Sequence, residues 1–153
     1  MANTYSQIYI QIVFAVEGRQ CLIRREHKEE LQKYISGVVR ERGQKVLAIH
    51  CMPDHTHLLV GLKPAMALSK LVQEVKNSSS NFINAKRWFP GRFSWQAGFG
   101  AFSYGHSQVP VVARYIENQE ARHARRSFGE EYLQLLKRFE IDHDERFVFR
   151  DAE

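Results

Sequence analysis

The sequence predicts an α+β protein with a ferredoxin-like antiparallel sheet, in the order β-α-β-β-α-β followed by two C-terminal helices. Three observations predict this class. Residues 5–16 alternate apolar and polar side chains, residues 26–42 and 66–88 repeat apolar ones at helical spacing, and a Pro53-Asp54 turn separates two short apolar stretches. Elements in this order are typical of the split βαβ pattern, in which the helices cover one face of the sheet.

The first four elements follow from local patterns. In residues 5–16 the apolar side chains occupy alternate positions, which predicts a half-buried strand. Residues 26–42 carry an apolar stripe at helical spacing and are followed by Gly43, a common helix stop. Residues 45–52 and 55–62 form two further strands, and the short turn between them makes an antiparallel hairpin.

The next two elements are a second helix and a fourth strand. Residues 66–88 show helical spacing with a polar opposite face, although a run of three serines lowers the helix propensity. The stretch 93–103 is aromatic and glycine-rich, and we expect a strand that is broken near Gly98 and Gly100. These elements complete the predicted sheet.

The C-terminal third is predicted to be helical after a hinge. Residues 104–110 contain glycine, serine and proline, and we expect a flexible linker there. Helices are expected over residues 111–125 and 130–138. We therefore predict a single domain over residues 1–140 and a C-terminal tail over residues 141–153.

Composition excludes several classes of protein. A chain of 153 residues with 44% hydrophobic and 25% charged residues is typical of a folded domain rather than a disordered one. No apolar run reaches the roughly 20 residues that span a bilayer, and no signal peptide is recognisable, so we expect a cytoplasmic protein without membrane contact. The 2 cysteines cannot form a disulfide framework. A net charge of +5 permits a nucleic-acid partner.

A pair of histidines, His55 and His57, is the first candidate for chemistry. Residues two apart on a strand point to the same face, about 6.6 Å apart, so both imidazoles can converge on one divalent cation. Thr56 and Leu58 then point to the opposite face. Two ligands do not complete a metal site, and the alternative is a pair of histidines on an exposed sheet face.

The helix after the linker offers complementary groups. Tyr115 and Gln119 are four residues apart and therefore neighbours on one helix face, and Arg122 and Arg126 fall on nearly the same face. A phenol, an amide and two guanidiniums suit a phosphodiester, because they supply a nucleophile, a metal ligand and positive charge. The alternative is a tyrosine that packs at the edge of the core beside a solvated polar surface.

Together these motifs resemble a known family. Pro53-Asp54-His55-Thr56-His57, the stretch Gln96–Ser103 and Tyr115-Ile116-Glu117-Asn118-Gln119 look like segments of the small single-strand DNA transposases of bacterial and archaeal insertion sequences. Those proteins belong to the His-hydrophobe-His endonuclease superfamily and have one catalytic tyrosine. The resemblance covers roughly residues 5–140. Thr56 departs from the apolar middle residue, but its side chain points away from the metal face.

The resemblance implies an activity and a set of roles. Tyr115 would attack a phosphodiester of single-stranded DNA and form a 5′-phosphotyrosine, leaving a free 3′ hydroxyl that later attacks another such intermediate. His55, His57 and Gln119 would hold Mg²⁺ or Mn²⁺, and mixed nitrogen and oxygen ligands suit Mn²⁺ better. The family acts on DNA with hairpin ends as homodimers, in which the tyrosine helix can complete the partner's site.

The sequence also offers candidate DNA contacts and competing functions. Candidate DNA-binding residues, besides Arg122 and Arg126, are basic side chains that could equally belong to a solvated helix face: Lys70, Lys76, Lys86, Arg87 and Arg92. One rival function is a non-catalytic nucleic-acid module on the same scaffold, and another is a domesticated relative that cleaves chromosomal hairpins. A small-molecule phosphoesterase with two His-x-Thr motifs fits poorly, since the sequence has a single His-Thr-His run and no His-x-Thr or His-x-Ser follows it.

Overall fold

The sheet has the predicted ferredoxin-like topology. The computed structural model describes residues 3–123, 126–144 and 148. One antiparallel sheet, with strand order β2-β3-β1-β4, is formed by four strands: β1 (Tyr9–Ala15), β2 (Lys45–Cys51), β3 (His55–Gly61) and β4 (Gly100–Tyr104). The hairpin β2-β3 and the fold class are therefore confirmed.

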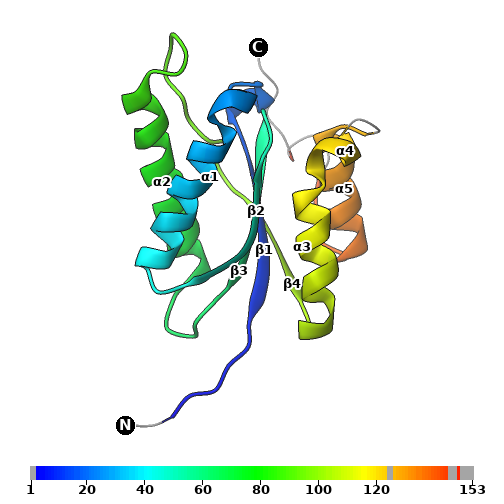
Figure 1. Cartoon of the computed structure of the whole chain (residues 1–153). Coiled ribbons are helices and arrows are strands. Elements are labelled where there is room, and N and C mark those ends of the chain that lie inside the picture. Colours follow the sequence, from blue (N-terminus) through cyan, green and yellow to red (C-terminus); the bar gives the residue numbers. More distant parts are fainter. Residues whose placement is uncertain (1–2, 124–125, 145–147, 149–153) are drawn as a thin grey trace.

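Helices cover both faces of this sheet (Figure 1). The first pair, on one face, is α1 (Arg25–Glu41) and α2 (Leu68–Lys86). The opposite face is covered by α3 (Val109–Glu117), α4 (Gln119–His123) and α5 (Phe128–Arg138). The expectation of helices on one face holds for the β-α-β-β-α-β part alone, because the C-terminal helices fold back and form a third layer.

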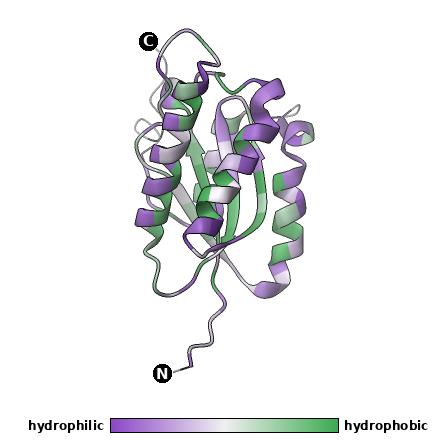
Figure 2. Cartoon of the chain, turned by 60° about the vertical axis from the view of Figure 1, so that its left-hand side comes forward, coloured by the Kyte–Doolittle hydropathy of each residue, from purple (hydrophilic) through white to green (hydrophobic). Residues whose placement is uncertain are grey.

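The third layer changes the environment of the central strand β1. Ile12 and Phe14 pack in the core under α1 and α2, whereas Val13 and Ala15 pack with Phe128 and other side chains of α5. Consequently every residue from Gln11 to Val16 is buried, and the prediction of a half-buried strand is wrong. Hydrophobic residues accordingly concentrate on the strands, between the two helical layers (Figure 2).

Specific contacts explain why α2 tolerates its serine run. The Ser79 hydroxyl donates to the carbonyl of Val75, 2.6 Å away, and accepts a hydrogen bond from the indole Nε1 of Trp95 at 2.9 Å. Trp95 in turn bridges to Val16 at the end of β1. A small hydroxyl at this position therefore ties the helix to the segment that leads into β4.

The predicted fourth strand and hinge differ from the structure. β4 begins at Gly100, and the residues before it are irregular apart from the bridge at Trp95. The expected linker over 104–110 is ordered, because the turn His106–Gln108 leads directly into α3, with Pro110 in its first turn. The helix expected over 111–125 is interrupted at Asn118, and its last two residues lie outside the described part of the chain.

Only part of the expected tail is described. Residues 141–144 have no regular structure, and Val148 packs against the cluster of apolar side chains under α5. The remaining residues of the tail lie outside the described part. No helix among the described residues combines the length and the apolar character that a membrane crossing requires.

Candidate active site

The two histidines of β3 point toward the C-terminal helices. His55 and His57 share one face of the strand with Leu59, which packs against α3, while Leu58 belongs to the core on the other side. Both imidazoles are fully buried, at 0% exposure. The alternative of a histidine pair on an exposed sheet face is therefore excluded.

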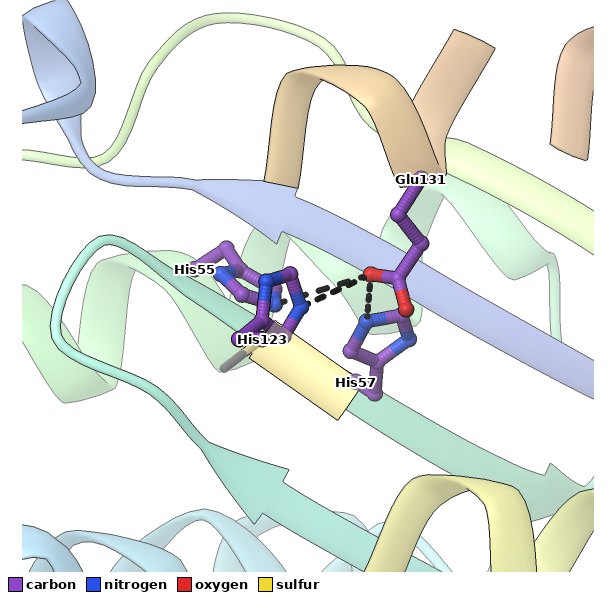
Figure 3. Close-up of side chains that lie close together, drawn as sticks. All are labelled: His55, His57, His123 and Glu131. Atoms are coloured by element: carbon purple, nitrogen blue, oxygen red, sulfur yellow. Dashed lines mark hydrogen bonds and ion pairs between the residues drawn. The ribbon is translucent and has the colours of Figure 1, made fainter. Parts of the chain in front are cut away.

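His123 of α4 and Glu131 of α5 complete a compact cluster with the two histidines (Figure 3). The Oε1 atom of Glu131 lies 2.9 Å from Nε2 of His57, 3.2 Å from Nε2 of His123 and 3.8 Å from Nε2 of His55. One ligand atom from each of the four residues lies within 4.8 Å of the other three. Four donors that converge in this way have the composition and spacing of a metal site.

The outer ring nitrogens of both β3 histidines are already occupied. Nδ1 of His55 contacts Oδ1 of Asp54 at 2.7 Å, and Nδ1 of His57 contacts Oε1 of Gln11 on β1 at 2.8 Å. Gln11 donates its amide to the hydroxyl of Tyr104 at 2.8 Å, which fixes the carbonyl oxygen toward His57. Such partners orient metal-binding histidines, and here they turn Nε2 of each ring toward Glu131.

Burial keeps His55 neutral. Desolvation lowers the pKa of His55 to about 4, with further lowering from His57 and His123, although Asp54 acts in the opposite direction. With its Nδ1 proton donated to Asp54, the ring presents a lone pair at Nε2 toward two oxygens, those of Gln119 at 3.5 Å and Glu131 at 3.8 Å. A lone pair that faces oxygens without a proton between them is the arrangement a cation would stabilise. The donor set therefore fits a divalent metal ion.

Tyr115 lies on the other side of Glu131. Its hydroxyl donates a hydrogen bond to Oε2 of Glu131, and a guanidinium nitrogen of Arg126 lies 3.4 Å from the same hydroxyl. The guanidinium of Arg122 stacks over the phenol ring at 4.4 Å from its centroid. Burial and the contact with Glu131 raise the pKa of Tyr115 above its ordinary value, so the resting site holds a phenol rather than a phenolate.

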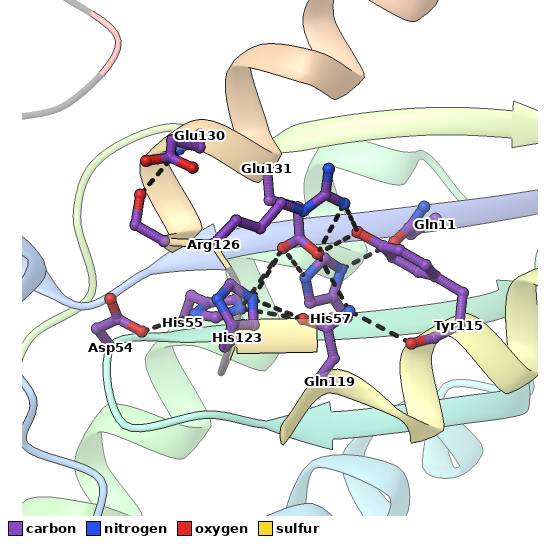
Figure 4. Close-up of polar contacts among 11 residues, drawn as sticks. Gln11, Asp54, His55, His57, Tyr115, Gln119, His123, Arg126, Glu130 and Glu131 are labelled. Carbon is purple, nitrogen blue, oxygen red and sulfur yellow. Dashed lines mark hydrogen bonds and ion pairs between the residues drawn. The ribbon is translucent and has the colours of Figure 1, made fainter. Parts of the chain in front are cut away.

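Glu131 connects the histidine cluster to the tyrosine (Figure 4). Its side chain is 0% exposed. Burial alone would raise the pKa of the carboxyl, but hydrogen bonds from His123 and His57 outweigh it and hold that pKa far below the usual range. The carboxylate is therefore ionised and occupies the space between a potential nucleophile and the potential metal ligands.

The predicted ligand Gln119 joins the same network. Its Oε1 lies 2.9 Å from Nε2 of His123, and its Nε2 donates to Oε2 of Glu131 at 3.2 Å. The structure thus brings together six of the predicted site residues: His55, His57, Tyr115, Gln119, Arg122 and Arg126.

The other predicted DNA-binding residues lie elsewhere. α2 and the loop after it carry Lys70, Lys76, Lys86, Arg87 and Arg92. This helix covers the opposite face of the sheet from α3, the helix that carries Tyr115 (Figure 1). The ammonium of Lys76 donates to the carbonyls of Gln96 and Gly98, and Lys86 pairs with Glu30 at 2.9 Å. These two lysines therefore already have intramolecular partners.

Sequence reasoning missed three members of the network, Gln11, His123 and Glu131. His123 continues the four-residue series of Tyr115 and Gln119, so helical spacing could have found it. Glu131 falls between Phe128 and Leu135 on the apolar stripe of α5, where a charged side chain is a signal of a buried polar role. Gln11 lies on the polar side of the alternating pattern of residues 5–16, and a half-buried strand would expose that side.

Comparison with known proteins gives the family. A model of the family described as "Transposase IS200 like" matches residues 4–119, which is most of the chain. The chain belongs to the IS200-like transposase family. The matched residues include the β3 histidines, Tyr115 and Gln119, but they end before His123 and Glu131.

Individual relatives agree with this assignment. The chain is 22% identical over 120 residues to the ISDra2 transposase TnpA of Deinococcus radiodurans, covering 74% of this chain and 84% of the relative. It is 23% identical over 124 residues to the transposase for insertion sequence element IS200 of Salmonella typhimurium, covering 78% and 81%.

Solved structures show the same fold. A candidate transposase from Deinococcus radiodurans R1 superposes with a TM-score of 0.61 at 21% identity, over 78% of this chain and 95% of that one. A REP-associated tyrosine transposase bound to a REP hairpin superposes with a TM-score of 0.59 at 17% identity, over 80% and 73%. The ferredoxin-like sheet and its helices therefore have counterparts of known structure.

Proposed function

We propose that this transposase cleaves and rejoins single-stranded DNA at insertion-sequence ends through a 5′-phosphotyrosine on Tyr115. The observation that carries the proposal is the carboxylate of Glu131, which contacts the Tyr115 hydroxyl with one oxygen and His57 with the other. The phenol of Tyr115 and the cluster of candidate metal ligands therefore contact the same carboxylate. Membership of the family supports the same activity, and such a protein would act on DNA in the cytoplasm.

We propose that a divalent metal ion is held by His55, His57, His123 and Glu131, with Gln119 beside them. When bound, the ion would polarise the scissile phosphate and stabilise the leaving oxygen. Because the donors are mainly imidazoles, the set suits Mn²⁺ better than Mg²⁺. Asp54 and Gln11 orient the two β3 imidazoles whether or not the ion is present.

In the proposed reaction Tyr115 is the nucleophile and Arg126 stabilises the phosphate. Tyr115 loses its hydroxyl proton as the phenolic oxygen forms a bond to phosphorus, the bond from phosphorus to the 3′ oxygen breaks, and that oxygen takes up a proton and leaves as a 3′ hydroxyl, so that no proton is gained or lost overall. Arg126, which lies beside the Tyr115 hydroxyl, neutralises charge on the phosphate. The reverse attack by another 3′ hydroxyl releases Tyr115 and joins the strands, so no external energy is needed.

We further propose a homodimer in which each subunit supplies its own tyrosine. Excision joins two DNA ends, and each chain carries one candidate nucleophile. Tyr115 and His57 of one chain are close, with ring centroids 6.0 Å apart, which supports a site completed within the subunit.

A second candidate function is cleavage of chromosomal hairpins by a domesticated relative. The structural likeness to a REP-associated transposase bound to a REP hairpin supports this second function.

A denaturation-resistant protein–DNA adduct tests the proposal. The protein is mixed with labelled single-stranded hairpin DNA from insertion-sequence ends and from repetitive chromosomal hairpins, with Mn²⁺ or Mg²⁺. We expect an adduct that is lost in Tyr115→Phe and retained in Tyr34→Phe, a tyrosine stacked on Phe82 in the opposite layer. An adduct that survives Tyr115→Phe would refute the assignment of the nucleophile, and binding without any adduct would favour a non-catalytic module.

A further inference from the structure

A cavity of about 450 Å³ lies between α3 and α5, and Tyr115 and Glu131 are part of its lining. Its volume falls in the range of roughly 300–1,000 Å³ that is usual for small-molecule sites. The cavity therefore borders the candidate nucleophile and is large enough for one nucleotide. None of the DNA-binding residues proposed on α2 contributes to it.

The charge of the cavity favours an anion. Three guanidiniums line it, those of Arg122, Arg126 and Arg138, against a single carboxylate, Glu131. That carboxylate is already engaged by His57 and His123. Within the described part of the chain, Arg122 and Arg138 have no ion-pair partner. Positive charge without a local counter-ion attracts phosphate groups.

The remaining lining is apolar and suits a base. Val111 of α3 is 60% exposed, and Val112 of α3 and Leu135 of α5 also border the cavity. Tyr104 adds an aromatic ring to the same lining. An apolar and aromatic wall beside guanidiniums matches the two parts of a nucleotide, namely a flat base and an anionic phosphate.

We propose that this cavity binds the nucleotide immediately downstream of the scissile phosphate, the one that stays attached to Tyr115 through its 5′ phosphate. The inference rests on the proposed function. In an in-line displacement the attacking and leaving oxygens lie on opposite sides of phosphorus. The upstream nucleotide, whose 3′ oxygen leaves, is therefore directed away from Tyr115. The retained nucleotide then occupies the space beside the tyrosine, where the guanidiniums of α4, α5 and the segment between them meet.

Nucleotide titration monitored by NMR tests the site without any need for cleavage. The isotope-labelled full chain is titrated with thymidine 5′-monophosphate, which mimics the retained nucleotide, and with inorganic phosphate. We expect shift changes along α3 and α5 and an affinity at least several-fold higher for the nucleotide than for phosphate. Shift changes confined to α1 and α2, or equal affinity for phosphate, would overturn the assignment.

A matched pair of variants assigns the effect to the cavity. Arg138→Gln removes a lining guanidinium, whereas Lys137→Gln removes the same charge from an exposed neighbour that does not line the cavity. We expect the affinity for thymidine 5′-monophosphate to fall about tenfold in Arg138→Gln and to change less than twofold in Lys137→Gln. Equal affinities in the two variants would overturn the inference.

The adduct assay separates this inference from the proposed function. If the wild-type protein forms the Tyr115 adduct but the nucleotide does not shift α3 and α5, the cavity assignment fails and the transposase chemistry stands. If no adduct forms but Arg138→Gln still weakens nucleotide binding selectively, the cavity is a nucleotide site and the proposed chemistry fails.

Discussion

Glu131 is the residue at which the two halves of the site meet. A buried carboxylate is costly unless it is fully paired, and here hydrogen bonds from His57, His123, Tyr115 and Gln119 compensate it. The donors on one side are potential metal ligands, and the donor on the other is the candidate nucleophile. Oε1 of Glu131, which lies 2.9 Å from Nε2 of His57, is the oxygen that a cation would bind.

Replacing this carboxylate should weaken metal binding. We expect Glu131→Gln to lower the affinity for Mn²⁺ by roughly tenfold or more, because loss of even an outer-shell partner costs about 10–100-fold. Calorimetric titration measures the Mn²⁺ affinity. The control is Glu130→Gln, which changes an exposed neighbour on α5. Equal affinity in the two variants would remove Glu131 from the ligand set, and thermal unfolding of each variant establishes that it is folded.

At the residue scale, the sequence predicts pairs within one element better than contacts between elements. His55 and His57 share a strand face, and Tyr115 and Gln119 share a helix face, so spacing alone brings each pair together. Glu131 reaches the site only because α5 folds back over β1, which no local pattern specifies.

At the scale of elements, apolar periodicity predicts the well-packed helices and strands closely. α1, α2, β2 and β3 lie within two residues of their expected bounds. The break predicted near Gly98 and Gly100 is confirmed, since β4 begins at Gly100, but local pattern does not show that this position packs against a helix far along the chain. A Cβ added at Gly100 would lie 2.7 Å from the hydroxyl of Tyr132 on α5, so a glycine is required where the strand meets that helix.

This contact makes a stability prediction. Gly100→Ala should lower the free energy of unfolding by about 1–3 kcal/mol, the usual cost of overpacking a close contact. Gly105→Ala is the matched control, because the nearest atom, Oε1 of Gln108, would be 3.8 Å from the new Cβ and the φ of Gly105 is −77°. Chemical denaturation of both variants measures the difference. A loss in Gly100→Ala no greater than in Gly105→Ala would contradict the packing argument.

At the scale of the whole molecule, α3, which carries Tyr115, is anchored to the sheet of its own chain. Val112 and Ile116 of α3 pack on Ala48 and Leu59 of the sheet. Glu120 of α4 pairs with Lys28 and Arg25 of α1, at 2.5 Å and 3.0 Å, which links the two helical layers. The sequence predicts the C-terminal helices but not the face they cover, since both faces of β1 carry side chains that can be buried.

A mixing experiment tests whether the site works within one subunit. We expect Tyr115→Phe and His57→Asn each to abolish the adduct, and a mixture of the two to remain inactive, because each chain then lacks part of its own site. The adduct is scored by denaturing electrophoresis after the subunits have been unfolded and refolded together. Restored activity in the mixture would show that the tyrosine helix serves the partner subunit.

The burial of His55 and His57 beneath the C-terminal layer also has a consequence for the reaction as a whole. For the proposed chemistry, a DNA strand must reach side chains that are sealed from solvent in the resting protein. We therefore expect each round of the proposed cleavage to begin with a conformational opening, so that the measured affinity for DNA would be the intrinsic affinity reduced by the fraction of molecules that are open. Substitutions that loosen the outer helices would tighten apparent DNA binding without touching the nucleic acid.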